Sequence, residues 1–229
     1  GYALCMIQDP AEPNLIFAGT EQGLWISFDN GTTFQQWKNG YPSVSTYDLA
    51  IQEREADLVI ATFGRAIWVL DDIRILRKAA TDKGNTFKSK ITVSAVQDAY
   101  QAQYKAATGY EWSTFGLWDA PNRSRGAAVS YFVKAVKDTS AKKVKADSVT
   151  VKIYNDKNEN IRNLKWKADT GFNRQYWGME EKGFRNPGSP KPRPGAPEPG
   201  GFQALPGTYK VVVMLGKDAD SALVTVKDD

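Results

Sequence analysis

The hydrophobic pattern of the first 78 residues is that of short strands separated by turns. Residues 14–26 align with residues 57–69 at a constant offset of 43. In each copy an apolar run is followed by a Gly-containing turn and by a second run that carries Trp25 or Trp68. A repeat of about 40–45 residues built from short strands is typical of β-propeller blades. The repeat therefore predicts two blades in residues 1–78, with both tryptophans packed between blades.

Two blades are fewer than a propeller needs. Propellers usually close with about 4–8 blades, and two blades alone leave sheet faces and edges uncovered. The sequence also begins with Gly1 and not with Met. We therefore expect this chain to be the C-terminal part of a longer protein, whose upstream blades are its first partner.

The pattern becomes irregular after residue 78 and later returns to strands. Residues 79–115 contain one apolar run at 91–94 and a stretch at 97–107 that suits a short helix or a polar connector. Six further strand-like runs, separated by turn clusters, indicate an immunoglobulin-like β-sandwich. These runs lie at 127–136, 148–154, 161–165, 173–177, 208–215 and 222–226. We expect an all-β chain with blades at 1–78, a connector at 79–115 and the sandwich at 116–229.

Within the predicted sandwich, residues 183–207 hold seven of the eleven prolines and six glycines. Proline cannot donate to a strand ladder, and proline-rich chain favours an extended polyproline conformation. The composition predicts a long exposed loop between two strands. A proline-rich strip that binds a partner is the alternative interpretation.

The net charge of +4 is the sum of two unlike parts. Residues 1–78 carry a net charge of −4, and residues 79–229 carry +8. Part of the positive charge is a lysine-dominated stretch without interleaved aromatic residues or a nucleic-acid-binding motif. These lysines are Lys134, Lys137, Lys142, Lys143 and Lys145. We interpret them as a solvated hairpin tip and expect no nucleic-acid partner.

The rarest residues exclude several kinds of chemistry. The chain has no His, which excludes a Ser-His-Asp triad, a histidine general base and a His-ligated zinc. Its only Cys, Cys5, excludes an intrachain disulfide and a cysteine-only metal cluster. No apolar run reaches the roughly 18 residues of a membrane span. We therefore expect no metal, no cofactor and no membrane span in this chain.

One turn carries a specific motif. Residues 27–34 read Ser-Phe-Asp-Asn-Gly-Thr-Thr-Phe, which fits the Asp-box pattern Ser-x-Asp-x-Gly-x-x-aromatic. The side chains of Ser27 and Asp29 can accept backbone N–H groups of the turn, and Gly31 can adopt a positive φ. Phe34 can anchor the turn against the core. The motif predicts a structural role for these four residues.

The second repeat copy and three later motifs resemble bacterial BNR/Asp-box proteins, which are described as sortilin-like or glycosyl-hydrolase-like propellers. The final blade of that family commonly reads Asp-Leu-Val-x-Gly-Thr-His-Gly-Arg-Ser-Ile-Trp-Val-Leu-Asp-Asp-Ile. Residues 57–73 resemble it, with Ala61 in place of the Gly, Phe63 in place of the His and Ala66 in place of the Ser. Residues 120–132, 171–177 and 205–211 resemble its C-terminal domain, including Gly-x-Asn-Arg-x-x-Trp and Pro-Gly-Thr-Tyr. The resemblance implies an exported protein, in the periplasm, at the cell surface or secreted.

The candidate chemistry is sparse. Glycoside hydrolysis needs two carboxyl groups that flank a sugar, and Asp71-Asp72 is the conspicuous pair. Neighbouring strand residues point to opposite faces, so we interpret this pair as a strand end or turn and assign no catalytic residue. The candidate ligand contacts are Arg65 at a hairpin tip and the tryptophans Trp112 and Trp118 before the sandwich.

Three functions remain open on the sequence alone. The first is a non-catalytic C-terminal part of a large exported Asp-box propeller protein, which binds a carbohydrate or a cell-surface protein. The alternative is part of a glycoside hydrolase whose catalytic carboxylates lie mainly in upstream blades. A third hypothesis, binding to a surface-assembly or secretion partner, rests only on the proline-rich segment and the basic sandwich.

Overall fold

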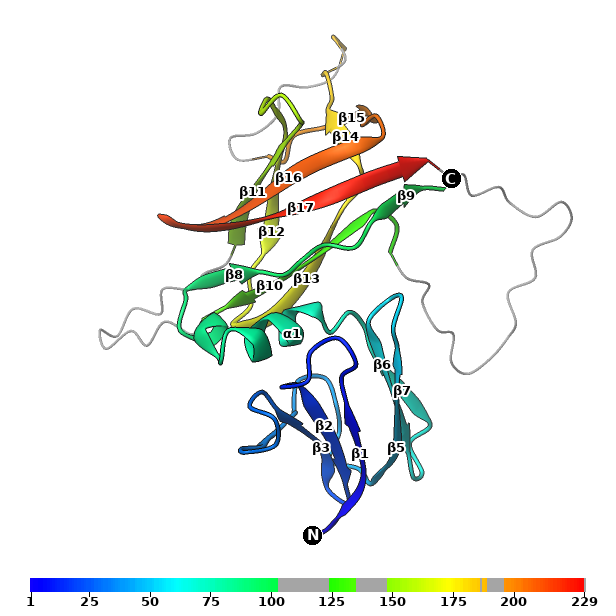
Figure 1. Cartoon of the computed structure of the whole chain (residues 1–229). Helices are drawn as coiled ribbons and strands as arrows, with labels where there is room; N and C mark the ends of the chain where they lie inside the picture. The colour runs from blue at the N-terminus through cyan, green and yellow to red at the C-terminus, as the bar shows by residue number, and fades with distance from the viewer. Residues whose placement is uncertain (103–123, 135–147, 186, 189–195, 229) are drawn as a thin grey trace, which may run out of the picture.

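The computed structural model describes residues 1–102, 124–134, 148–185, 187–188 and 196–228. Strands account for 52% of the described residues and helices for 6%, which confirms the all-β prediction. Figure 1 shows the N-terminal strands at one end of the molecule, the long C-terminal strands at the other and one helix between them. The candidate contacts Trp112 and Trp118 lie outside the described residues, as do the lysines from 137 to 145.

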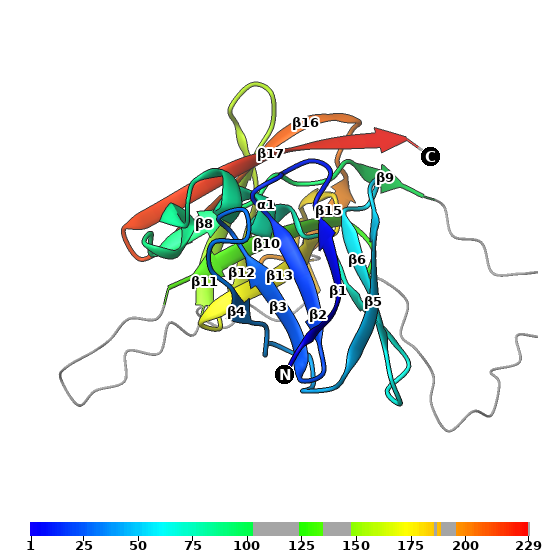
Figure 2. The same cartoon turned by 60° about the horizontal axis from the view of Figure 1, so that its bottom comes forward.

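The N-terminal end is made of two antiparallel sheets. The first sheet, in the order β1-β2-β3-β4, comprises β1 (Ala3–Gln8), β2 (Ile16–Thr20), β3 (Gly23–Ser27) and β4 (Gln35–Gln36). The second sheet, in the order β5-β6-β7, comprises β5 (Thr46–Gln52), β6 (Asp57–Thr62) and β7 (Ile67–Leu70). The two sheets lie side by side in Figures 1 and 2. They share one hydrophobic core, to which the first sheet contributes Phe17 and Ile26 and the second Leu58 and Ile60.

Helix α1 (Arg74–Thr81) connects this end to the rest of the chain and was not predicted from the sequence. Its buried residues Ile75, Leu76, Ala79 and Ala80 lie on one side, in the i, i+4 pattern of an amphipathic helix. On its polar side, the Arg77 guanidinium lies 2.9 Å from the Asp9 carboxylate, whose side chain is fully buried. Lys78 Nζ donates to the Val93 carbonyl at 2.7 Å. The helix therefore joins the first sheet to the C-terminal half. The short 3-10 helix η1 (Asn85–Phe87) follows it.

The C-terminal half contains two larger sheets around a second hydrophobic core. One has the order β13-β10-β8, and the other has the order β12-β11-β16-β17-β9. The three strands of the first are β8 (Ile91–Val93), β10 (Ala127–Val133) and β13 (Gly171–Trp177). The five strands of the other are β9 (Ala99–Gln101), β11 (Ser148–Tyr154), β12 (Asn160–Lys167), β16 (Gly207–Leu215) and β17 (Asp218–Asp228). Val129, Val151 and Val213 are fully buried between them. Each of the six predicted runs overlaps a strand.

Two local expectations were wrong. Residues 99–101, within the stretch expected to form a helix or connector, form strand β9, which pairs in parallel with β17. Inside the expected loop 183–207, β15 (Gly200–Gln203) pairs with β14 (Glu180–Lys182). This pairing is possible because Gly183 and Gly200 bring the two backbones so close that a Cβ on Gly183 would collide with the Gly200 carbonyl.

Candidate functional site

The two repeat copies differ in strand register, and the difference decides which way their tryptophans point. In the first sheet Ala18 lies opposite Trp25, whereas in the second sheet Ile60 lies opposite Trp68. A one-residue change of register turns side chains to the other face of a sheet. Trp68 accordingly faces the shared core, 5.6 Å from the Tyr41 ring between centroids. Trp25 lies on the outer face of the first sheet and not between the two sheets, so the expectation that it packs between blades stays a prediction.

The Asp-box residues form a hydrogen-bonded turn between β3 and β4. Ser27 Oγ accepts the Gly31 N–H at 2.8 Å and donates to Asp29 Oδ1 at 2.8 Å. Asp29 Oδ1 also accepts the Thr33 N–H at 2.8 Å, and Gly31 has a φ of 84°. The hydrogen bond from the Thr33 hydroxyl is the main cause that lowers the pKa of Asp29 below its usual range. Phe34 was expected to anchor the turn against the core, but it lies on the outer face of the first sheet and is 38% exposed.

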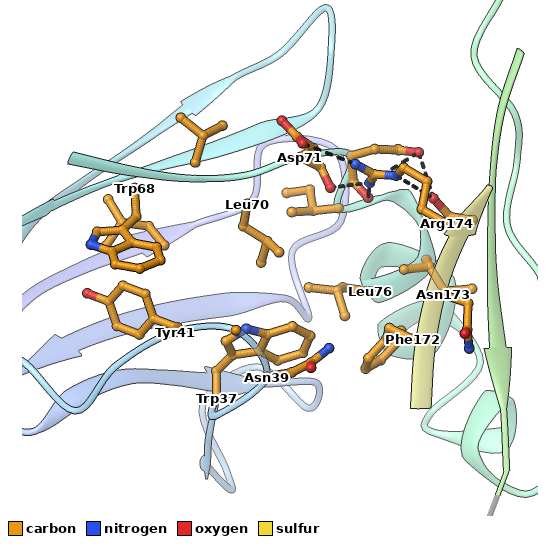
Figure 3. Close-up of a pocket in the computed structure, with 17 residues that line it drawn as sticks. Trp37, Asn39, Tyr41, Trp68, Leu70, Asp71, Leu76, Phe172, Asn173 and Arg174 are labelled. Atoms are coloured by element: carbon orange, nitrogen blue, oxygen red, sulfur yellow. Dashed lines mark hydrogen bonds and ion pairs between the residues drawn. The ribbon is translucent and has the colours of Figure 1, made fainter. Parts of the chain in front are cut away.

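A pocket of about 350 Å³ opens where the second sheet meets β13. Four aromatic side chains line it, together with the amides of two asparagines. The aromatic residues are Trp37, Tyr41, Trp68 and Phe172, and the asparagines are Asn39 and Asn173. Figure 3 shows the rings gathered on one side, with Arg174 and Asp71 at the far end. The pocket thus combines an apolar floor with polar groups at its ends, as small-molecule and peptide sites commonly do.

The charged end of the pocket is a network centred on Arg174. Its guanidinium lies 3.4 Å from an Asp71 carboxylate oxygen and 3.8 Å from an Asp72 carboxylate oxygen. It also donates to the backbone carbonyl of Asp71. Asp72 is buried, and its other carboxylate oxygen lies 2.7 Å from Arg74. The contacts of Arg174, dashed in Figure 3, tie the end of β7 to β13.

The geometry corrects one inference about Asp71 and Asp72. Strand alternation predicts that their side chains point apart, yet both reach the same guanidinium. The reason is that Asp72 has a φ of 50°, which breaks the strand conformation after β7. The interpretation of the pair as a strand end agrees with their position directly after Leu70.

The remaining sequence candidate, Arg65, lies away from the pocket. It is exposed in the turn between β6 and β7, where its backbone carbonyl accepts the Trp68 indole N–H at 2.9 Å. The sequence reasoning missed Trp37, Phe172 and Arg174 as pocket residues. Arg174 carried a signal, since it lies in the Gly-x-Asn-Arg motif.

The described part of the chain has neither a cluster of metal-ligating side chains nor a membrane-spanning helix. Its His, Cys, Asp and Glu residues form no group of three that could hold a metal ion. No helix there has the length and apolar character needed to cross a membrane.

Comparisons with known proteins identify no family for this chain. No protein-family model matches the chain, and no curated protein does either. Among solved structures, the extracellular domain of a proposed one-component system from B. thetaiotaomicron aligns with 12% sequence identity and a TM-score of 0.24. The alignment covers 99% of this chain and 25% of that one, so the chain spans a quarter of its length. A TM-score of 0.24 does not show a shared fold.

Proposed function

We propose that this chain is the non-catalytic, ligand-binding C-terminal part of an exported Asp-box propeller protein. In this proposal the first and second sheets are two blades, and the C-terminal half is an immunoglobulin-like sandwich. The ligand is a carbohydrate or a polypeptide, and it binds in the pocket between the second sheet and β13. The export and the family membership rest on the sequence resemblance.

The outer faces of both N-terminal sheets support the blade assignment. On the first sheet Tyr2 is 65% exposed and Met6 is 68% exposed. On the second sheet Ile67 and Val69 are 69% and 52% exposed. Contiguous exposed apolar surface marks interaction sites in folded proteins. Such faces suit the stacking of further sheets against each side, as the propeller proposal requires.

The composition of the pocket carries the proposal of ligand binding. Its rings offer flat apolar surface, and the Asn39 amide and the Arg174 network offer polar groups. The Trp37 and Phe172 rings lie 5.3 Å apart between centroids and come from opposite halves of the molecule. A ligand that fills this pocket would therefore contact both halves at once.

The carboxylates beside the pocket favour binding over hydrolysis. A glycosidase places two carboxyl groups across a sugar, about 5–9.5 Å apart, and needs one of them to give up and take up protons. Asp71 and Asp72 are instead both engaged by Arg174, and Asp72 also by Arg74. The alternative of a glycoside hydrolase, whose catalytic carboxylates would lie mainly in upstream blades, does not draw on this pair.

The test is to screen the fluorescently labelled chain on glycan and peptide arrays and to repeat the screen with the pocket blocked. Asn39→Trp would place an indole over the pocket, whereas Lys38→Trp adds the same ring one residue outside it. We expect Asn39→Trp to weaken binding of any captured ligand by about tenfold or more, and Lys38→Trp to leave it within about twofold. Equal binding by the wild type and Asn39→Trp would refute the pocket as the site.

A further inference from the structure

Among the residues that the structure describes, the outer edge of β7 lacks the strand that covers the corresponding edge of the first sheet. By the offset of 43, β7 corresponds to β3, whose outer edge is paired with β4. There the Trp37 N–H donates to the Leu24 carbonyl at 2.8 Å. Within the described residues β7 pairs with β6 alone, so the carbonyl of Ile67, the counterpart of Leu24, has no such donor.

The hydrogen-bonding phase of β7 shows which backbone groups face this open edge. The Thr62 N–H donates to the Ala66 carbonyl at 3.2 Å, which makes these two residues a hydrogen-bonded pair. Such pairs alternate with non-bonded pairs along an antiparallel ladder. Trp68 and Leu70, each an even number of residues from Ala66, therefore bond to β6. The N–H and C=O groups of Ile67 and Val69 point outward.

The sequence of β7 lacks several of the features that protect edge strands. Natural edge strands are usually guarded by short length, Lys, Pro, bulges or a covering element. The strand Ile67–Leu70 contains neither Lys nor Pro, and its register with β6 runs without a shift. Farther along the same edge, the outward carbonyl of Asp71 is already capped by Arg174. The open stretch is therefore short, apolar and bounded at one end.

The pocket lies beside this open edge. Trp68 and Leu70 present their side chains to the pocket, and Trp37 and Tyr41 form its opposite wall, as Figure 3 shows. In a sheet, side chains of neighbouring strands at the same level share a face. A strand added next to β7 would therefore place every second side chain in the pocket and the others beside Ile67 and Val69.

We propose that the outer edge of β7 binds an extended peptide strand from another polypeptide. Ile67 and Val69 supply the backbone hydrogen bonds, and the aromatic pocket takes an apolar or aromatic side chain of the peptide. This is β-strand addition, in which the main chain gives affinity and alternate side-chain pockets give specificity. The inference rests on the proposed function, because it uses the same pocket, and it narrows the ligand to a polypeptide.

The experiment measures fluorescence anisotropy of a labelled peptide, Thr-Phe-Thr-Phe-Thr-Phe-Thr, titrated with the chain. Val69→Pro removes only an outward N–H, which an edge strand tolerates, and Val69→Thr keeps that N–H as the matched control. We expect Val69→Pro to weaken binding by about tenfold or more and Val69→Thr to change it by less than about threefold. A peptide methylated on its backbone nitrogens tests the same hydrogen bonds without altering the chain.

The outcomes separate this inference from the proposed function. Binding that survives both Val69→Pro and backbone methylation overturns strand addition, even if Asn39→Trp abolishes it. Glycans that bind in the pocket while the peptide does not also overturn the inference and leave the proposed function standing. A dimer of the chain that Val69→Pro dissociates, without peptide binding, identifies a second copy as the occupant and overturns it as well. If no ligand responds to Asn39→Trp, both proposals fail.

Discussion

The first and second sheets share one 43-residue repeat but differ in strand register, because the turns between their strands differ in length. A two-residue turn after Thr20 leads into β3, whereas four residues, 63–66, separate β6 from β7. In the longer turn Ala66 adopts a φ of 59°. The one-residue change of register sends Trp25 outward and Trp68 inward. Similar sequence therefore produces one sheet with an aromatic outer face and another with an aromatic inner pocket.

The equivalent aspartates show the second difference. Asp29 and Asp72 occupy the same position in the repeat. Asp29 accepts hydrogen bonds within its own turn, from Ser27 and Thr33, and the chain returns to form β4. Asp72 pairs with Arg74, and the chain leaves the sheet as α1. After the Asp box the chain returns as β4 and pairs with the outer edge of β3. After Asp72 the chain continues into the helix, so among the described residues no strand pairs with the outer edge of β7.

Exchanging one equivalent residue between the sheets should have the largest effect. Gly19 corresponds to Thr62, but a Cβ on Gly19 would lie 2.5 Å from Cys5 Sγ and 2.6 Å from the Thr46 carbonyl. Gly19→Thr should lower the free energy of unfolding by about 3 kcal/mol, because this contact between the sheets leaves no room. Thr62→Gly should cost only about 1 kcal/mol through backbone entropy. Urea unfolding measures both, and equal losses would contradict the assigned packing.

Removing the two equivalent tryptophans, Trp25 and Trp68, should give a smaller difference in the free energy of unfolding. Trp68→Ala should lower the free energy of unfolding by about 3 kcal/mol, since the ring packs on the shared core. Trp25→Ala should cost about 1 kcal/mol, because that ring lies on the outer face. Thermal or urea unfolding decides the order. A larger loss for Trp25→Ala would mean that the register difference between the sheets is wrong.

The Asp box should contribute the smallest effect, and one that depends on pH. The hydrogen bonds of Thr33 and Ser27 lower the pKa of Asp29 in the folded state. A lowered carboxyl pKa stabilises the fold above the unfolded-state pKa and loses that contribution as the pH falls through the folded-state value. Asp29→Asn should therefore lower the melting temperature most at pH 6, and less as the pH falls below the usual range of a carboxyl pKa. A gap that is constant across this pH range would count against the ionised carboxylate as the source.

The sequence predicted the elements whose signals are local. The 43-residue offset located both sheets, and the turn residues Ser27, Asp29 and Gly31 were recognised by spacing alone. The apolar runs also marked the C-terminal strands. The repeat did not reveal the change of register, because alignment equates Trp25 with Trp68 whatever the turn does to their faces.

The pocket was not predictable from the sequence because its walls are far apart along the chain. Trp37 and Phe172 meet only through the way α1 and the Arg174 network join the two halves. Helix α1 was not predicted because most of it lies in residues assigned to the end of the repeat, although Leu76 and Ala80 have helical spacing. The strand pairing of Gly200 was missed because proline-rich composition outweighed the close approach that glycine permits.

The open edge of β7 is the central claim, and amide hydrogen exchange measured by NMR tests it most directly. Ile26 and Val69 are equivalent in the repeat, but in the described part of the chain only Ile26 has a strand, β4, along its outer edge. We expect the Val69 amide to exchange at least about tenfold faster than the Ile26 amide, and the Trp68 amide to be protected. Adding the labelled peptide should slow Val69 and leave Ile26 unchanged. A Val69 amide as protected as Ile26 in the free chain would contradict the account.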